Sequence, residues 1–178
     1  MNQPFKTDIE AIRERARKEM QKGAVTEAYR ADRDQVIKVL NEVLATEIVC
    51  VLRYKYHYFM ASGIHGEQAA EEFLEHANDE QEHADRVAER ITQLGGRPNF
   101  NPEGLHTRAH AEYVEGASLR EMIEEDLVAE RIAIETYSEI ARWLKDDDST
   151  TRRMIEEILE QEEEHADDMA SLLDRLGD

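Results

Sequence analysis

One spacing of acids and histidines occurs twice in this sequence. A glutamate precedes a Glu-x-x-His motif by 33 residues in the first copy and by 32 residues in the second. Residues three apart lie on one face of a helix, so each motif presents a carboxylate and an imidazole in the same direction. Two such motifs, each with its own preceding glutamate, predict four helices that meet at one level. The six residues are Glu47, Glu80, His83, Glu130, Glu162 and His165.

The rest of the sequence also favours helices. Its 178 residues include only three prolines and eight glycines, and apolar residues recur at steps of three and four. We therefore predict an all-α fold with one main domain. The expected elements are a short amphipathic helix over residues 7–22 and four long helices, over residues 33–62, over 67–94, from Ser118 to the acidic loop 146–148, and over 149–176.

The linkers set the expected connectivity of the four long helices. Short loops after the first and third of them, the former at residues 63–66, force antiparallel hairpins. Residues 95–117 contain Pro98, Pro102 and Gly104, which discourage a continuous helix. At roughly 3.3 Å per residue this linker reaches about 75 Å when extended, whereas each long helix measures about 42 Å. We predict a four-helix bundle with one long crossover, preceded by an N-terminal helical extension over residues 1–30.

Charge and cysteine content exclude several classes of protein. The formal net charge is -19, which argues against nucleic acid as a partner and favours cations. The apolar runs are far shorter than the roughly 20 residues of a membrane span, and the first residues lack a signal-peptide pattern. Cys50, the single cysteine, cannot form an internal disulfide or a four-thiolate iron site. We expect a cytoplasmic protein whose metal chemistry uses Glu, Asp and His.

The paired motifs predict a centre with two metal ions. A Glu from each of two helices and a Glu-x-x-His from each of the other two is the ligand set of di-iron and di-manganese bundles. With 41 acidic residues a single match is weak evidence, but two matches at nearly equal offsets within apolar stretches are strong evidence. Four buried glutamates would repel one another, and two divalent ions would neutralise them. Oxygen and imidazole ligands suit iron or manganese, with zinc as a competitor.

Residues on the same helix faces are candidates for supporting roles. Tyr54 lies two turns after Glu47, where it is either a redox or hydrogen-bonding aromatic or a core tyrosine; for Tyr137, two turns after Glu130, the core interpretation is favoured. Asp126 is the candidate acceptor for the outer N–H of a ligand histidine, and Gln161 is a weaker one. Cys50 is expected to be a small buried hydrophobe. The remaining histidines are interpreted as surface or structural, namely His57, His65, His76, His106 and His110.

With these residues in place, the chain resembles a bacterioferritin, within the ferritin-like superfamily. The similarity covers about residues 34–176, and the segments that carry it are 40–54, 80–86, 94–99, 126–130 and 158–165. The resemblance implies that residues 31–178 form a ferritin-like di-iron bundle with two irons per subunit. It also implies a role for each site residue: Glu47 and Glu130 as terminal ligands, Glu80 and Glu162 as bridging ligands, His83 and His165 as imidazole ligands, and Tyr54 as the catalytic tyrosine beside the centre.

The function implied by the resemblance is that of a ferroxidase, which oxidises Fe²⁺ with O₂ or H₂O₂ for iron storage and detoxification. Haem is not expected, because Gln81 occupies the position of the family's haem-binding methionine. The sequence continues for only 13 residues after His165, too few for the family's fifth helix. A 12-subunit cage is therefore favoured over a 24-subunit cage, and a dimer stays open. Two alternative functions also stay open: a rubrerythrin-like peroxidase or di-iron oxygenase, and a structural or DNA-protecting Dps-like protein.

Overall fold

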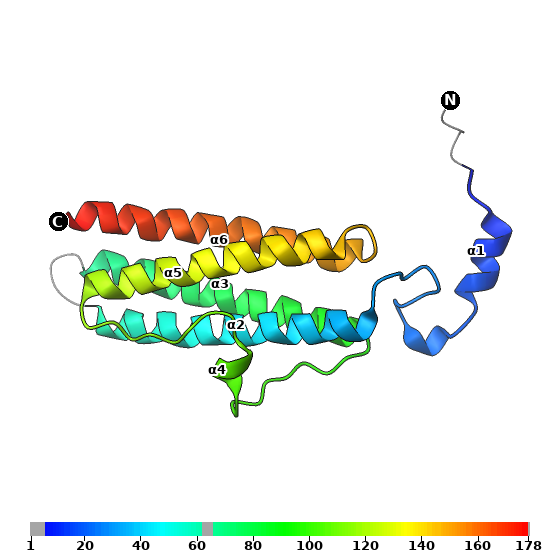
Figure 1. The fold of residues 1–178 in the computed structure, drawn as a ribbon, viewed down its shortest axis with the longest axis horizontal. Helices are drawn as coiled ribbons and strands as arrows, with labels where there is room; N and C mark the ends of the chain where they lie inside the picture. Colours follow the sequence, from blue (N-terminus) through cyan, green and yellow to red (C-terminus); the bar gives the residue numbers. More distant parts are fainter. Residues whose placement is uncertain (1–5, 62–65, 178) are drawn as a thin grey trace.

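Four long helices form an antiparallel bundle in the computed structural model, which describes residues 6–61 and 66–177 (Figure 1). Helix α2 pairs with α3, and α5 pairs with α6, which confirms the two predicted hairpins. There is no strand among the residues described, as the all-α prediction requires. The predicted turn at residues 63–66 lies outside those residues except for its last glycine. The bundle helices are α2 (Arg33–Met60), α3 (Gly66–Gln93), α5 (Leu119–Leu144) and α6 (Ser149–Leu176).

Side-chain caps explain where three of these helices begin. The carboxylates of Asp32 and Asp148 accept hydrogen bonds from the backbone N–H groups three residues later, at 3.2 Å and 2.9 Å. At the start of α5, Ser118 caps the N–H of Glu121 at 3.2 Å, and the Glu121 carboxylate accepts from the backbone N–H of Ala117 at 2.7 Å. Reciprocal bonds of this kind satisfy donors that a helix N-terminus leaves free, as the sequence pattern predicted.

The segment between α3 and α5 returns along the bundle beside α2, so the predicted long crossover is confirmed (Figure 1). It contains one short helix that the sequence did not predict, α4 (Leu105–Arg108). Gly104 starts this turn with a φ of 70°, a left-handed conformation that favours glycine. The Thr107 hydroxyl donates to the Gly104 carbonyl at 2.8 Å, so local polar bonds form the turn where apolar periodicity is absent.

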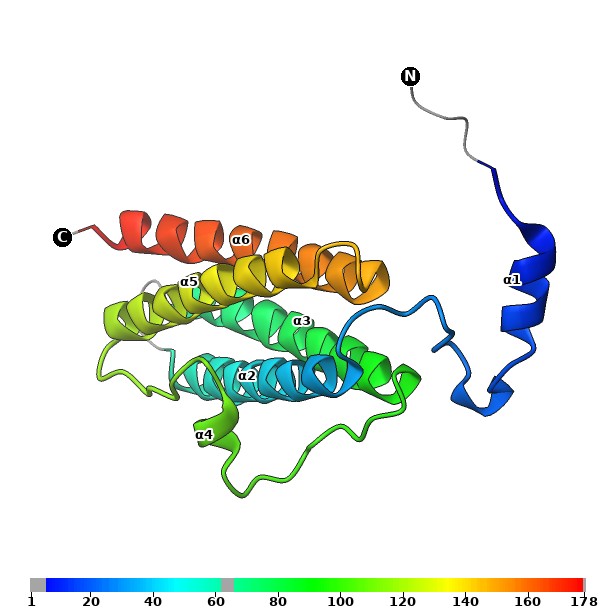
Figure 2. The same ribbon diagram turned by 45° about the vertical axis from the view of Figure 1, so that its right-hand side comes forward.

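The first part of the N-terminal segment stands clear of the bundle in both ribbon views (Figures 1 and 2), whereas Val25, Tyr29 and Ala31 pack against the bundle core. Where one helix was predicted over residues 7–22, there are α1 (Ile9–Ala16) and a short 3₁₀ turn, η1 (Met20–Lys22). Glu19 separates them with a φ of 47°, which a continuous right-handed helix does not allow. Further along, the Tyr29 hydroxyl donates to Asp148 at 3.0 Å and joins this segment to the start of α6. The domain boundary after residue 30 stays a prediction.

The bundle interior consists of two apolar clusters with a polar layer between them. One cluster includes Val36, Leu40, Ile91 and Ile155, and the other includes Phe73 and Met169. In each of the four helices the predicted metal ligands lie between residues of the first cluster and residues of the second. Acidic groups in such a layer are costly to bury unless they are paired or ligate a metal. None of the described helices is long and apolar enough to cross a membrane.

Candidate metal centre

The structure brings all six predicted ligand residues together in the polar layer. Helices α2 and α5 each contribute one glutamate, and α3 and α6 each contribute a Glu-x-x-His pair. Every one of these side chains is almost fully buried, with residue exposures of 1 % for Glu47, Glu80, Glu130 and Glu162, 0 % for His83 and 4 % for His165. Equal spacing within two antiparallel hairpins has placed them at one level of the bundle.

The six residues form two overlapping groups whose ligand atoms lie within 4.8 Å of one another. We call them the His83 half and the His165 half. Both halves contain Glu80 and Glu162; the His83 half adds Glu47 and His83, and the His165 half adds Glu130 and His165. The two groups share two glutamates, and each group has one glutamate and one histidine of its own. Two divalent ions bridged by carboxylates need this arrangement.

Both histidines direct Nδ1 toward the carboxylates. In the His83 half, Nδ1 lies 3.2 Å from Glu80 and 3.2 Å from Glu162. In the His165 half, Nδ1 lies 3.7 Å from Glu162 and 3.9 Å from both Glu80 and Glu130. The opposite ring nitrogen of each histidine faces away from the centre. Nδ1 is therefore the ring nitrogen available to a metal in both halves.

The outward nitrogens have different partners. Nε2 of His83 lies 3.0 Å from the Gln161 side-chain oxygen, and Nε2 of His165 lies 3.4 Å from the Asp79 carboxylate. An acceptor behind a histidine fixes its tautomer and leaves the inner nitrogen free to ligate. The sequence predicted Gln161 as a possible acceptor behind a ligand histidine, and it lies there. The same prediction for Asp126 was wrong, because Asp126 bonds Arg53 and His57 instead. The sequence analysis did not name Asp79, which directly precedes Glu80 and lies behind His165.

Asp126 belongs to a buried ion cluster that holds the crossover against α2. Its two carboxylate oxygens bond Nε of Arg53 and Nδ1 of His57, each at 2.7 Å. Arg53 also donates to the Glu112 carbonyl at 2.9 Å, and His57 Nε2 lies 3.0 Å from the Glu115 carbonyl. The arginine is the partner that a fully buried carboxylate requires. His57 thus has a structural role, as predicted, because it joins Asp126 to the crossover.

Two tyrosines bond the terminal glutamates across the bundle. The Tyr54 hydroxyl of α2 donates to Glu130 of α5, and the Tyr137 hydroxyl of α5 donates to Glu47 of α2. Burial, with the adjacent glutamate, raises the pKa of each phenol well above its ordinary value, so both hydroxyls keep their protons. Tyr137 is buried in the core, as favoured, but its contact with Glu47 gives it the same relation to the centre as Tyr54.

The protonation states show the strain of the ligand set without a cation. Burial raises the pKa of Glu80 and of Glu130 well above the usual range, and the charge of Glu162 adds to both. Burial opposes a charge on His83, but the neighbouring carboxylates of Glu162, Glu47 and Glu80 outweigh it and raise its pKa. A site that favours bound protons in this way also suits cations.

Orphaned atoms point to the same fit. Three buried ligand atoms have no hydrogen-bond partner: Glu80 Oε1, Glu162 Oε1 and His165 Nδ1. Buried polar atoms are normally satisfied, so unsatisfied atoms concentrated here need an explanation. Glu80 and Glu162 are common to both halves and His165 belongs to one of them, and divalent ions bound in the two halves would satisfy all three atoms. The residues present therefore fit a two-ion centre with carboxylate and imidazole ligands.

Other sequence candidates fall outside this centre. Cys50 is 4 % exposed, as expected of a small buried residue. His76 is 2 % exposed, and its ring stacks on that of His165 with centroids 4.0 Å apart. His110 lies 3.1 Å from the Thr46 hydroxyl, His106 is exposed, and His65 lies outside the described residues. Gln81 is exposed on α3 and donates to Asp85 at 3.1 Å, and the expectation of no haem stays a prediction.

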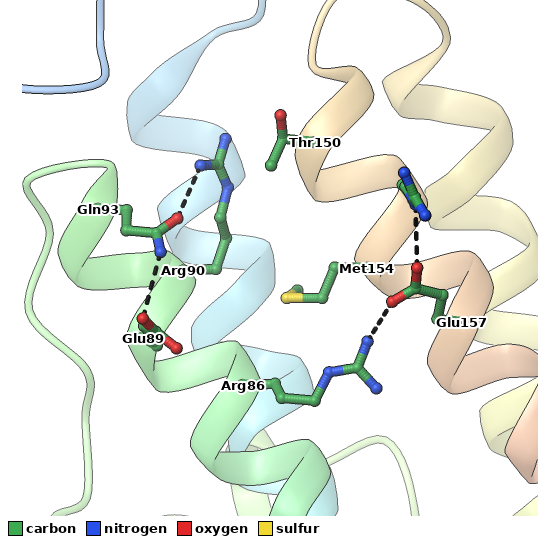
Figure 3. Close-up of a pocket in the computed structure, with 8 residues that line it drawn as sticks. Arg86, Glu89, Arg90, Gln93, Thr150, Met154 and Glu157 are labelled. Carbon is green, nitrogen blue, oxygen red and sulfur yellow. Dashed lines mark hydrogen bonds and ion pairs between the residues drawn. The ribbon is translucent and has the colours of Figure 1, made fainter.

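A surface pocket of about 280 Å³ lies between α3 and α6, toward the start of α6 (Figure 3). It is rich in arginine, but the arginines are paired. Arg86 and Arg153 both bond Glu157, at 2.6 Å and 3.0 Å, and Arg90 pairs with Asp148 at 3.0 Å. These contacts hold the two hairpins together at this end, and we assign the pocket no ligand.

Comparison with known proteins agrees with the fold. The family model described as "Ferritin-like domain" matches residues 37–177. The chain belongs to this family. It is 36% identical to the bacterioferritin of Desulfovibrio desulfuricans over 149 residues, which cover 81% of this chain and 79% of the relative. The span of the family model takes in all six predicted ligand residues, and the predicted resemblance to the ferritin-like superfamily is confirmed.

Solved structures give the same family. The bacterioferritin-related protein of Bacteroides fragilis, described as a dodecameric thioferritin, is 30% identical with a TM-score of 0.79, covering 83% of this chain and 89% of that one. A Dps protein from Thermosynechococcus elongatus has a TM-score of 0.75 at 20% identity, covering 79% and 90% of the two chains. The Dps similarity shows the shared fold alone.

Proposed function

We propose that this protein is a ferroxidase that binds two Fe²⁺ ions per chain as its substrate. The observation that carries the proposal is the pair of overlapping ligand groups that share Glu80 and Glu162. Iron chemistry in bacterioferritin relatives supports the choice of metal, as does a ligand set of carboxylates and imidazoles without thiolate. The proposed ligands are the six residues of the centre.

Shared ligands suit a two-electron reaction. Two Fe²⁺ ions held side by side each give one electron, so O₂ with two protons becomes H₂O₂, or H₂O₂ with two protons becomes two waters. Glutamates give up protons when ions bind, because the raised pKa values of Glu80 and Glu130 keep these groups protonated in the metal-free state. Tyr54 and Tyr137 hold Glu130 and Glu47 in place by hydrogen bonds, and Tyr54 is the proposed catalytic tyrosine.

An oligomeric cage is the proposed context for iron storage. The similar Bacteroides fragilis protein is described as a dodecamer, which supports the preference for a 12-subunit cage over a 24-subunit one. The strong net negative charge would concentrate cations near such a shell. Storage and peroxide detoxification both follow from the same chemistry, since the ferric product is retained and the oxidant is consumed.

The direct test is an anaerobic Fe²⁺ titration of the metal-free protein, followed by a pulse of O₂ or of H₂O₂. We expect absorbance from ferric iron to saturate at two irons per chain, with a faster reaction for the physiological oxidant. A Glu82→Gln variant, altered at an exposed acid beside the ligands, serves as the control and should behave as the wild type does. Absence of ferric absorbance at this stoichiometry with either oxidant would contradict the proposal.

A further inference from the structure

A third group of cation-ligand residues lies beside the His165 half and opens to solvent. It consists of Glu72 and His76 on α3 and Asp168 on α6, whose ligand atoms lie within 4.8 Å of one another. His76 is 2 % exposed, Glu72 is half-buried, and the Asp168 side chain is 53 % exposed. This outer group is therefore anchored in the interior by a histidine and reaches the surface through two carboxylates.

The two ring nitrogens of His76 face different surroundings. Nδ1 of His76 lies 3.3 Å from the Tyr54 hydroxyl, which also bonds Glu130, so this nitrogen is engaged on the side of the centre. The opposite nitrogen, Nε2, points toward the outer group and is the atom that His76 offers to a cation there.

Carboxylates surround this outward nitrogen. Nε2 of His76 lies 3.5 Å from the Asp168 carboxylate, with Glu72 in the same group. Burial raises the pKa of Glu72, and the charges of Asp168 and Glu75 add to the effect. The two carboxylates that converge here repel each other, and a divalent cation among the three side chains would remove the repulsion and use all three as ligands.

His76 also connects this group to the centre. Besides stacking on His165, it belongs to a further group with Glu130 and His165 whose ligand atoms lie within 4.8 Å. An ion held by Glu72, His76 and Asp168 could therefore pass to Glu130 and His165 while it stays bound to His76. No comparable group of acids and histidines lies beside His83 among the residues that the structure describes.

We propose that Glu72, His76 and Asp168 form a third divalent-cation site that loads Fe²⁺ into the His165 half of the centre. The identity of the ion rests on the proposed ferroxidase function, whereas the existence of the site rests on its own three side chains. Water would complete the coordination on the solvent side, where Asp168 is exposed. Loading through this site would make the His165 half the first to fill.

The test compares two double variants in their assembled state. Glu72→Gln with Asp168→Asn removes two ligands but keeps His76, which contacts Tyr54 and His165. Glu71→Gln with Asp167→Asn changes the charge equally at exposed neighbours on the same two helices and is the matched control. Anaerobic equilibrium binding of Fe²⁺ should give one ion fewer per chain in the first variant, and the wild-type number in the control.

Rapid mixing then separates loading from oxidation. When Fe²⁺ and O₂ are added together, the ligand variant should oxidise iron more slowly than the control; when Fe²⁺ is preloaded anaerobically, both should react at the wild-type rate. Equal Fe²⁺ stoichiometry in wild type and ligand variant would overturn the third site. Equal slowing after preloading would overturn its role in loading. Failure of the wild type to bind two ions at the centre would instead refute the proposed function.

Discussion

The two halves of the centre have the same kinds of ligand but different surroundings. Behind His83 is the neutral amide of Gln161, and the ring is fully buried. Behind His165 is the carboxylate of Asp79, and beside it lies His76 with a group of acids that reaches solvent. The repeated sequence motif makes the ligand sets similar, and residues outside the motif make the two positions unequal. Equivalent ligands thus do not imply equivalent ions.

The largest expected effect comes from a residue that both halves use. Glu80→Gln removes a charge from both groups, so we expect binding of both ions to be lost. Glu47→Gln alters the His83 half alone, so one ion should stay bound. Anaerobic Fe²⁺ equilibrium dialysis measures both, with Glu82→Gln as the control. Two ions bound to the Glu80→Gln protein would show that this residue is not a shared ligand.

A second difference between the hairpins concerns stability. Asp126 lies four residues before Glu130, whereas the position four residues before Glu47 holds the buried apolar Val43. Asp126→Asn leaves the guanidinium of Arg53 buried without its charge partner, which we expect to cost about 3–5 kcal/mol of unfolding free energy. Urea unfolding of the metal-free protein measures the change, with the exposed pair partner Glu124→Gln as control. A loss comparable to that of the control would contradict this account of the ion cluster.

Protons and metal ions compete for the shared ligands, which gives a pH dependence. The pKa values of Glu80, Glu130 and His83 are raised in the folded metal-free protein, so it binds more protons than the unfolded chain does. Its stability should therefore fall as pH rises through these folded-state values. The pKa of Glu47 is lowered instead, so its contribution to stability is lost as pH falls below the ordinary carboxyl range, outside the window in which the raised groups act.

Bound metal reverses this behaviour, because ligands are deprotonated when they coordinate an ion. The difference in melting temperature between metal-loaded and metal-free protein should widen as pH rises from about 5 to about 8. Thermal unfolding at constant ionic strength, with and without a divalent ion, measures it. A difference that narrows with rising pH would contradict the assignment of protons to the metal-free centre.

The smallest expected effects come from the acceptors behind the histidines. Asp79→Asn should lower the affinity of the His165 half for its ion by about 10–100-fold, a typical result for residues that orient a ligand. Gln161→Glu should raise the affinity of the His83 half for its ion and bring the affinities of the two binding steps closer together. Stepwise Fe²⁺ affinities from anaerobic calorimetry report both changes. If the difference between the two Fe²⁺ affinities is the same in both variants as in the wild type, these acceptors do not cause it.

The sequence predicted the parts of the site that depend on periodicity. Spacing along helices and equal offsets in two hairpins predicted the four bundle helices, the crossover and the convergence of Glu47, Glu80, His83, Glu130, Glu162 and His165. What it did not predict depends on contacts between different helices. Asp126 pairs with Arg53 because the two face each other across α2 and α5, and no spacing along one helix shows this.

The role of His76 was missed for a similar reason. It lies four residues before Glu80, one turn away, so its place on the ligand face of α3 was visible in the sequence. Its stacking on His165 of α6 depends on the packing of α3 against α6. The break at Glu19 and the short helix α4 depend on local backbone conformations that apolar periodicity does not report.

Anomalous diffraction from crystals loaded anaerobically with Fe²⁺ tests the central claim most directly. Data collected on both sides of the iron absorption edge should show two peaks inside the bundle of each chain. One should lie among Glu47, Glu80, His83 and Glu162, and the other among Glu80, Glu130, Glu162 and His165. A bundle interior without iron peaks, or with a single peak outside these two groups, would contradict the two-ion centre.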